Sequence, residues 1–195
     1  MNSPQLVLAS ASPRRRELLG QIGLIFKVVV TNIDESVKHN ETPVQYVERL
    51  AIAKAKAGYA PECVVLGADT TVSIDGEILG KPSGQAEGIA MLGKLSGRAH
   101  EVITAIAAFD GTALESIVVS SIVHFREISA DEAKKYWATG EPVDKAGGYG
   151  IQGIGGIFAQ RLEGSYSAVV GLPLEQTERL LRKFTIDTWS TRIHG

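Results

Sequence analysis

The sequence is poor in cysteine, with a single residue of this type, Cys63, so no internal disulfide can form. This usage is compatible with a reducing compartment. Long apolar runs are also lacking, because no stretch approaches the about 20 residues that span a bilayer and no secretory signal pattern opens the chain. We therefore expect a soluble, cytoplasmic protein with no membrane partner. Cys63 lies in an apolar run and is expected to be a core residue.

An excess of charge of either sign is missing as well. The 20 Lys and Arg residues nearly balance the 22 Asp and Glu residues, so no overall basic field would attract nucleic acid. Zinc-ligand spacing is absent among the histidines, which we interpret as structural or surface residues: His39, His100, His124 and His194. The chain also lacks the phosphate loop of P-loop NTPases and the G-x-S-x-G turn of serine hydrolases. Its glycine-rich stretches lack the strand-loop-helix context of the dinucleotide fingerprint of Rossmann dehydrogenases.

The chain has 195 residues, 44% of them hydrophobic, which is enough for one domain or for one domain with a lobe. Strand patterns occur at residues 6–9, 26–30, 63–66, 70–74, 77–79, 101–109, 113–125 and around 168–170. Helices are predicted to begin after Ser12, Thr42, Ser83, Ser129 and Pro173. This alternation predicts an α/β fold with a mixed sheet, and it places Asp69 between two strands.

A phosphate site is predicted where the first strand leads into the first helix. Ser12 is the expected N-cap and Pro13 the first helical residue. The backbone N–H groups at a helix start, together with the macrodipole, favour an anion. Three consecutive arginines, residues 14–16, oppose the usual preference for acidic residues in a first turn, which suggests that a ligand compensates their charge. The alternative is a solvated basic turn.

A set of carboxylates and cations lies at other turns and strand ends. It comprises Asp34, Glu35, Lys54, Asp69 and Lys81. Oxygen ligands and cations together suit a hydrated divalent metal and a polyphosphate. Taken singly, each of these residues could instead end a strand or face solvent. Six glycines between residues 146 and 156 predict either a loop that approaches a ligand closely or a flexible connection.

Taken in order, these motifs resemble the Maf family of nucleoside triphosphate pyrophosphatases, over about residues 6–184. The resemblance rests on Ser10-Ala11-Ser12-Pro13-Arg14-Arg15, Ile33-Asp34-Glu35, Ala53-Lys54-Ala55-Lys56-Ala57, Gly67-Ala68-Asp69-Thr70, Gly80-Lys81-Pro82 and Gly171-Leu172-Pro173-Leu174. It implies a Maf/ITPase-like fold with an elongated mixed sheet flanked by helices, two lobes with a central cleft, and a homodimer. The whole chain, residues 1–195, would be one such domain, with a poorly ordered tail at 187–195.

The resemblance also assigns roles. It implies that Ser10, Arg14 and Arg15 surround the triphosphate, while Lys54 and Lys81 add positive charge from other elements. Charge that develops on the leaving pyrophosphate would be stabilised by these cations. Lys56 is a rival for the role of Lys54.

The acidic pair implied by the resemblance is Glu35 and Asp69, which would hold Mg²⁺ or Mn²⁺. Asp69 matches the family position that accepts a proton from the water attacking the α-phosphorus. A carboxylate is a weak base unless the metal acidifies that water, so metal and base should depend on each other. Asp34 is a comparable candidate to Glu35.

The substrate base is inferred from three positions. The branch of the family that acts on dTTP and UTP resembles this chain at Arg14, Thr70 and Gln152. The branch that acts on 7-methyl-GTP tends to have tryptophan, glutamine and glutamate, respectively, at these positions. A neutral amide both donates and accepts, which matches the edge of uracil or thymine. We therefore expect hydrolysis of dTTP, UTP or modified pyrimidine triphosphates to the monophosphate and pyrophosphate.

Two other functions stay open at this point. The chain could be a nucleotide-binding regulator of cell division or septum formation with slow or incidental hydrolysis. It could also release the terminal phosphate, using the same charged groups with a shifted substrate register. The identity of the products distinguishes all three.

Overall fold

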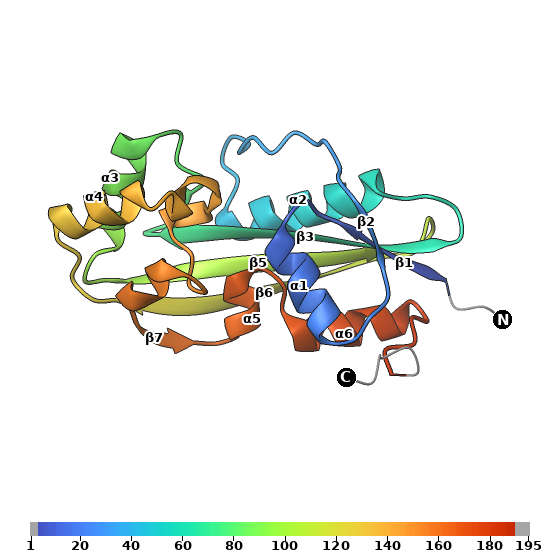
Figure 1. Cartoon of the computed structure of the whole chain (residues 1–195). Helices are drawn as coiled ribbons and strands as arrows, with labels where there is room; N and C mark the ends of the chain where they lie inside the picture. Colours follow the sequence, from blue (N-terminus) through green and yellow to red (C-terminus); the bar gives the residue numbers. More distant parts are fainter. Residues whose placement is uncertain (1–3, 190–195) are drawn as a thin grey trace. The chain divides into compact units, whose positions relative to one another are not determined.

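A computed structural model describes residues 4–189 (Figure 1). The strands are β1 (Gln5–Ala9), β2 (Lys27–Val29), β3 (Cys63–Ile74), β4 (Glu77–Leu79), β5 (Ala99–Phe109), β6 (Leu114–Phe125) and β7 (Ala159–Glu163). The α-helices are α1 (Pro13–Gln21), α2 (Pro43–Ala57), α3 (Gln85–Leu95), α4 (Ala130–Ala138), α5 (Tyr166–Val170) and α6 (Leu174–Lys183). Three short 3-10 helices complete the described elements: η1 (Glu141–Asp144), η2 (Ala146–Gly148) and η3 (Ile154–Phe158).

The strands of the described residues form a sheet in the order β2-β1-β3-β5-β6-β7, with β4 added to β3. Strand β1 pairs in parallel with β2 and β3, whereas the β3–β4 and β6–β7 pairs are antiparallel. The mixed sheet that the sequence predicts is thereby confirmed. Among residues 4–189, no helix has both the length and the apolar character needed to cross a membrane.

The chain divides into two compact units, and strands β3, β5 and β6 contribute residues to both. Among the described residues, unit 1 comprises residues 4–69, 104–119 and 171–189, and unit 2 comprises residues 70–103 and 120–170.

In unit 1, α2 packs closely against β3. Its apolar stripe of Val47, Leu50 and Ala51 is fully buried, as the sequence predicts. Gly67 of β3 permits the approach, since a Cβ atom at this position would lie 2.6 Å from the backbone nitrogen of Ala55. This contact sets the distance between α2 and the strand that carries Asp69.

In unit 2, helices α3 and α4 pack against each other (Figure 1). Gly88 provides the space, because a Cβ atom there would clash with the ring of Trp137. The core beneath is aromatic, with Phe125 in edge-on contact with Tyr149 and Tyr136 in edge-on contact with Phe158. This core underlies the glycine-rich segment.

Several local predictions are confirmed. Ser12, Thr42 and Ser129 are N-caps that accept a hydrogen bond from the third helical N–H, and the last two form complete capping boxes. The Asp75-Gly76 hairpin turn joins β3 to β4, with Ile74 opposite Glu77.

Two predictions about strands are wrong. Residues 63–66 and 70–74 form one continuous strand, β3, with Asp69 inside it, because sheet pairing carries the chain through Gly67-Ala68-Asp69. Residues 168–170 are helical, since the Ser165 hydroxyl accepts a hydrogen bond from the N–H of Ala168 and starts the short helix α5.

Strand β7 was not predicted at all, and it is a mostly exposed edge strand with no continuous apolar run. In the predicted poorly ordered tail, Thr188 is buried and its hydroxyl donates to Glu178, while residues 190–195, with His194, lie outside the described residues.

Candidate active site

The turn between β1 and α1 holds the first group of candidate residues. Ser12 caps the helix, and the Ser10 hydroxyl accepts a hydrogen bond from the backbone of Ser12 at 3.2 Å. Ser10 is buried and Arg14 is half-buried, whereas Arg16 is exposed. The three consecutive arginines are therefore in different environments, although they form one basic cluster in the sequence.

Arg15 is buried against backbone carbonyls. Its Nε donates to the oxygen of Gly171, and Nη1 donates to the oxygen of Ala68, each at 2.9 Å. Nη1 also donates to Ser10 Oγ at 3.4 Å. Burial lowers the pKa of Arg15, and the negative charge of Asp69 opposes this effect. Arg15 thus connects the helix start to the residue that precedes Asp69.

Lys54 lies between two carboxylates. Its ammonium group donates to Asp69 Oδ1 at 2.6 Å and contacts Glu35 Oε1 at 2.8 Å. Lys54 and Asp69 are only 8% and 7% exposed, so this pair is largely withdrawn from water. Lys56, two positions along α2, is exposed. The helix therefore directs Lys54, and not its rival, toward the acidic residues.

Glu35 lies on the segment between β2 and α2, which residues of α2 hold in place. The Tyr46 hydroxyl donates to the backbone oxygen of Glu35 at 3.0 Å. Arg49 donates to the backbone oxygen of Ser36 at 2.9 Å and to both carboxylate oxygens of Glu41. These contacts fix the backbone at Glu35 and at the next residue, Ser36.

Asp34 is used differently from Glu35. Its carboxylate accepts a hydrogen bond from the backbone N–H of Ser36 at 2.9 Å, which lowers the pKa of Asp34. The structure therefore brings Glu35 to Lys54, while Asp34 shapes the turn.

Tyr46 and Arg49 are site residues that the sequence analysis missed. Burial raises the pKa of Tyr46 to about 12, with further contributions from the charges of Asp69 and Glu35. The helical period could have identified Tyr46, because this residue precedes Lys54 by eight positions and so shares a face of α2 with it.

The donor set of this cluster fits a hard divalent cation. Glu35 and Asp69 already converge on one positive group, and their carboxylate oxygens are ligands that Mg²⁺ and Mn²⁺ prefer. Within residues 4–189, no group of three or more His, Cys, Asp or Glu side chains could hold a metal ion. An ion bound here would take its remaining ligands from water or from a phosphate-bearing molecule.

Unit 2 contains the other candidates. Thr70 directly follows Asp69 on β3 and is half-buried, whereas Lys81 and Gln152 are exposed. The backbone oxygen of Gly80 accepts a hydrogen bond from the N–H of Gly147 at 3.0 Å. The structure thus joins the segment that carries Lys81 to the glycine-rich segment that carries Gln152.

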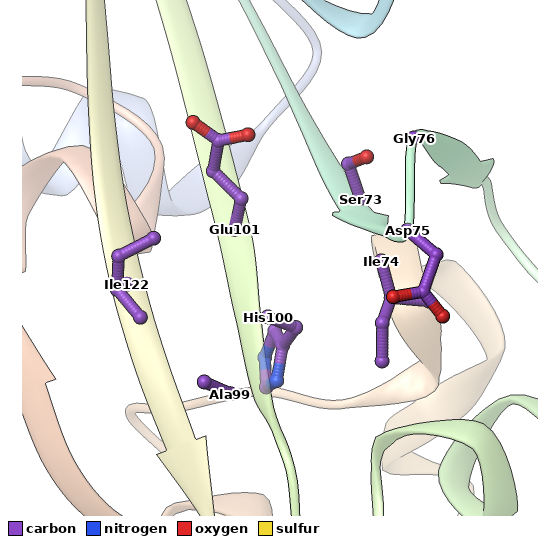
Figure 2. A pocket seen from close by; sticks show the side chains of 8 residues that line it. All are labelled: Ser73, Ile74, Asp75, Gly76, Ala99, His100, Glu101 and Ile122. Atoms are coloured by element: carbon purple, nitrogen blue, oxygen red, sulfur yellow. The ribbon is translucent and has the colours of Figure 1, made fainter.

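A hollow of about 160 Å³ in unit 2 contains none of the predicted site residues. Figure 2 shows Asp75, His100 and Glu101 among the side chains that line it. Asp75 bonds Arg98, Glu101 accepts from Ser120, and His100 Nε2 bonds the Tyr149 hydroxyl at 2.8 Å, whereas His100 Nδ1 has no hydrogen-bond partner among the described residues. We do not consider it part of the candidate active site.

The fold and the site define a class of mixed α/β protein. In this class a lysine on a helix, Lys54, pairs with one carboxylate on a strand, Asp69, and one on a loop, Glu35, near the start of another helix. The Maf-like protein family matches residues 5–184, and the chain belongs to the Maf family.

Named relatives cover the chain almost completely. A dTTP/UTP pyrophosphatase of Vibrio cholerae serotype O1 is 52% identical over 187 residues, which are 94% of this chain and 100% of that protein. A dTTP/UTP pyrophosphatase of Hahella chejuensis is 50% identical over 191 residues, 95% of either chain. Among solved structures, the Ham1 protein of Staphylococcus aureus is 18% identical with a TM-score of 0.44, and covers 65% of this chain and 72% of its own.

Proposed function

We propose that this chain is a nucleoside triphosphate pyrophosphatase that hydrolyses dTTP and UTP to the monophosphate and pyrophosphate. The geometric observation that carries the proposal is the buried Lys54 ammonium between Asp69 and Glu35. The names of the relatives that match the chain over nearly its full length supply the substrate class.

In the reaction, Asp69 accepts a proton from a water molecule whose oxygen attacks the α-phosphorus. The bond between the α-phosphorus and the bridging oxygen breaks, and pyrophosphate leaves with the electron pair. Lys54 orients the base, because its ammonium group donates to Oδ1 of the carboxylate at 2.6 Å. Burial strengthens this restraint, since water competes little for the same groups.

Several positively charged groups are proposed to bind the triphosphate. Arg14 and the α1 N-terminus would bind phosphate oxygens, and Ser10 would add a hydroxyl donor. Arg15 would act by holding Ala68 and Gly171 in place while its charge contributes to the local potential. Lys81 is proposed to stabilise the charge that develops on the departing pyrophosphate.

Mg²⁺ or Mn²⁺ would be held by Glu35 and Asp69. When bound, such an ion lowers the pKa of a coordinated water and neutralises phosphate charge. The Tyr46 and Arg49 contacts support the role of Glu35, because they fix the backbone from which its carboxylate projects.

Base selection is assigned to Arg14, Thr70 and Gln152. The Gln152 amide presents both a donor and an acceptor to a uracil or thymine edge. Its exposure on the loop leaves those groups accessible. Modified pyrimidine triphosphates with the same edge would be accepted as well.

The test is incubation of the purified protein with UTP, dTTP, CTP and GTP, with and without Mg²⁺ or Mn²⁺, and chromatographic identification of the products. We expect metal-dependent formation of UMP or dTMP together with pyrophosphate. Diphosphate and orthophosphate would mean that the terminal phosphate is cleaved instead. Nucleotide binding without turnover would favour a regulator of cell division.

A homodimer and a cytoplasmic location belong to the same proposal, on the strength of the family resemblance. Sedimentation velocity at several protein concentrations would test the dimer. Fractionation of cells that produce the protein would test the location.

A further inference from the structure

A carboxylate lies beneath the glycine-rich segment of unit 2. Glu141 Oε2 accepts a hydrogen bond from the backbone N–H of Ile154 at 2.8 Å, and Oε1 accepts one from the N–H of Gly155 at 2.9 Å. Hydrogen bonds to a charged acceptor are stronger than those between neutral groups. Glu141 therefore restrains the chain two and three residues after Gln152.

Tyr136 restrains the other side of Gln152. Its hydroxyl donates to Glu141 Oε1 at 2.7 Å and accepts from the N–H of Gly150 at 3.1 Å. The ring is 3% exposed and packs edge-on against Phe158, with the centroids 5.1 Å apart. A rigid core residue thus anchors the carboxylate and the chain two residues before Gln152.

The glycines make this close approach feasible. A Cβ atom at Gly153 would lie 2.6 Å from the carboxylate carbon of Glu141, and one at Gly155 would lie 2.5 Å from the Tyr136 hydroxyl. These positions therefore have a steric reason to lack side chains. The same glycines would leave the segment flexible if the carboxylate did not bind its backbone.

We propose that Glu141 is a positioning residue that selects for the pyrimidine base by holding Gln152 in its binding orientation. This inference rests on the proposed function, which assigns base recognition to Gln152. A glycine-rich segment that became ordered only when substrate binds would lose conformational entropy, which would weaken binding. Because Glu141 restrains the segment beforehand, this entropic cost of binding is reduced.

The chemistry of the carboxylate supports this role. Burial raises the pKa of Glu141, but hydrogen bonds from Tyr136, Gly155 and Ile154 outweigh it and hold the pKa below its usual range. A glutamine side chain at this position has nearly the same shape and only one acceptor oxygen, so its NH₂ group would face backbone N–H donors. Glu141→Gln therefore removes the restraint with little change in volume.

The experiment compares Glu141→Gln, Gln152→Ala and the double variant, with Glu163→Gln as the matched control. The Glu163 carboxylate is about half exposed and bonds His124 and Arg161 of the same unit. The measurements are kcat and KM for UTP and CTP, together with hydrogen exchange at the amides of Ile154 and Gly155.

We expect Glu141→Gln to lower kcat/KM for UTP about tenfold, the size of one lost hydrogen bond to a charged group, mainly through KM. Its UTP preference over CTP should fall, and amide exchange at Ile154 and Gly155 should accelerate. In the Gln152→Ala background the same change should have little further effect on the preference. Glu163→Gln should match the wild type.

Independent effects of the two changes on base preference, or a loss confined to kcat, would overturn the proposal. If Glu141→Gln does not fold, Tyr136→Phe serves instead, because it removes one hydroxyl from the same network and keeps the ring. If the wild type hydrolyses no pyrimidine triphosphate, the proposed function fails. The positioning role is then decided by calorimetric binding of UTP and CTP, where an unchanged affinity ratio in Glu141→Gln refutes it.

Discussion

Replacing Asp69 with asparagine should preserve the fold and remove most of the turnover. The amide oxygen can still accept a hydrogen bond from Lys54, and Lys54 keeps its ion pair with Glu35 at 2.8 Å. The buried ammonium is therefore not left without a partner. An amide cannot take the proton of the attacking water, so the chemical step loses its base.

The stability cost follows from one weakened charge-assisted hydrogen bond, the 2.6 Å contact between Lys54 and Asp69. We expect a decrease of about 2 kcal/mol in the free energy of unfolding. For a chain of 195 residues this corresponds to a decrease in Tm of about 4–8 °C. The loss of a general base is expected to lower kcat by about 10²–10⁴-fold.

The assay is single-turnover release of pyrophosphate from UTP with saturating Mg²⁺, alongside thermal unfolding followed by circular dichroism. Asp75→Asn is the matched control, because this aspartate follows the same strand, is 72% exposed and forms a surface ion pair with Arg98. A variant with Asn at position 69 that turns over within a few-fold of the wild type would refute the assignment of the base. So would an equal loss in the control.

Further predictions concern pH, the metal and the base. Burial lowers the pKa of His100 to about 4 in the folded protein, from 6.5, so the unfolded chain binds the proton first as the pH falls. About 3 kcal/mol of stability present above pH 6.5 should be lost toward pH 4, and denaturant titrations should show a flatter profile in His100→Gln. Glu35→Gln should raise the Mg²⁺ concentration needed for half-maximal turnover about tenfold or more, whereas an equal rise in Asp34→Asn would make Asp34 the ligand. Gln152→Glu should lower kcat/KM for UTP and dTTP, and unchanged rates on every base would exclude Gln152 from base recognition.

The caps and hairpin turns were predictable because they depend on neighbouring residues. Ser12, Thr42 and Ser129 bond N–H groups three positions away, and the Asp75-Gly76 turn needs only its own backbone conformation. The strand predicted at residues 168–170 was wrong for a related reason. Its apolar residues are buried, as a strand pattern requires, but the nearby Ser165 hydroxyl caps them into a helix.

The mixed α/β class, the candidate cations and carboxylates, and the family resemblance could all be predicted from the order of residues along the chain. Which member of each candidate pair reaches the site depends on packing between distant segments. Lys54 and Lys56, like Asp34 and Glu35, differ little in sequence context. The packing of α2 on Gly67 directs Lys54 toward Asp69, and contacts from Tyr46 and Arg49 of α2 hold the backbone at Glu35. The role of Glu141 could not be predicted either, because this residue binds Ile154 and Gly155 through contacts that span 13 and 14 residues. Local sequence patterns predict hydrogen bonds between residues that are close along the chain, whereas contacts between distant segments form only when the chain folds.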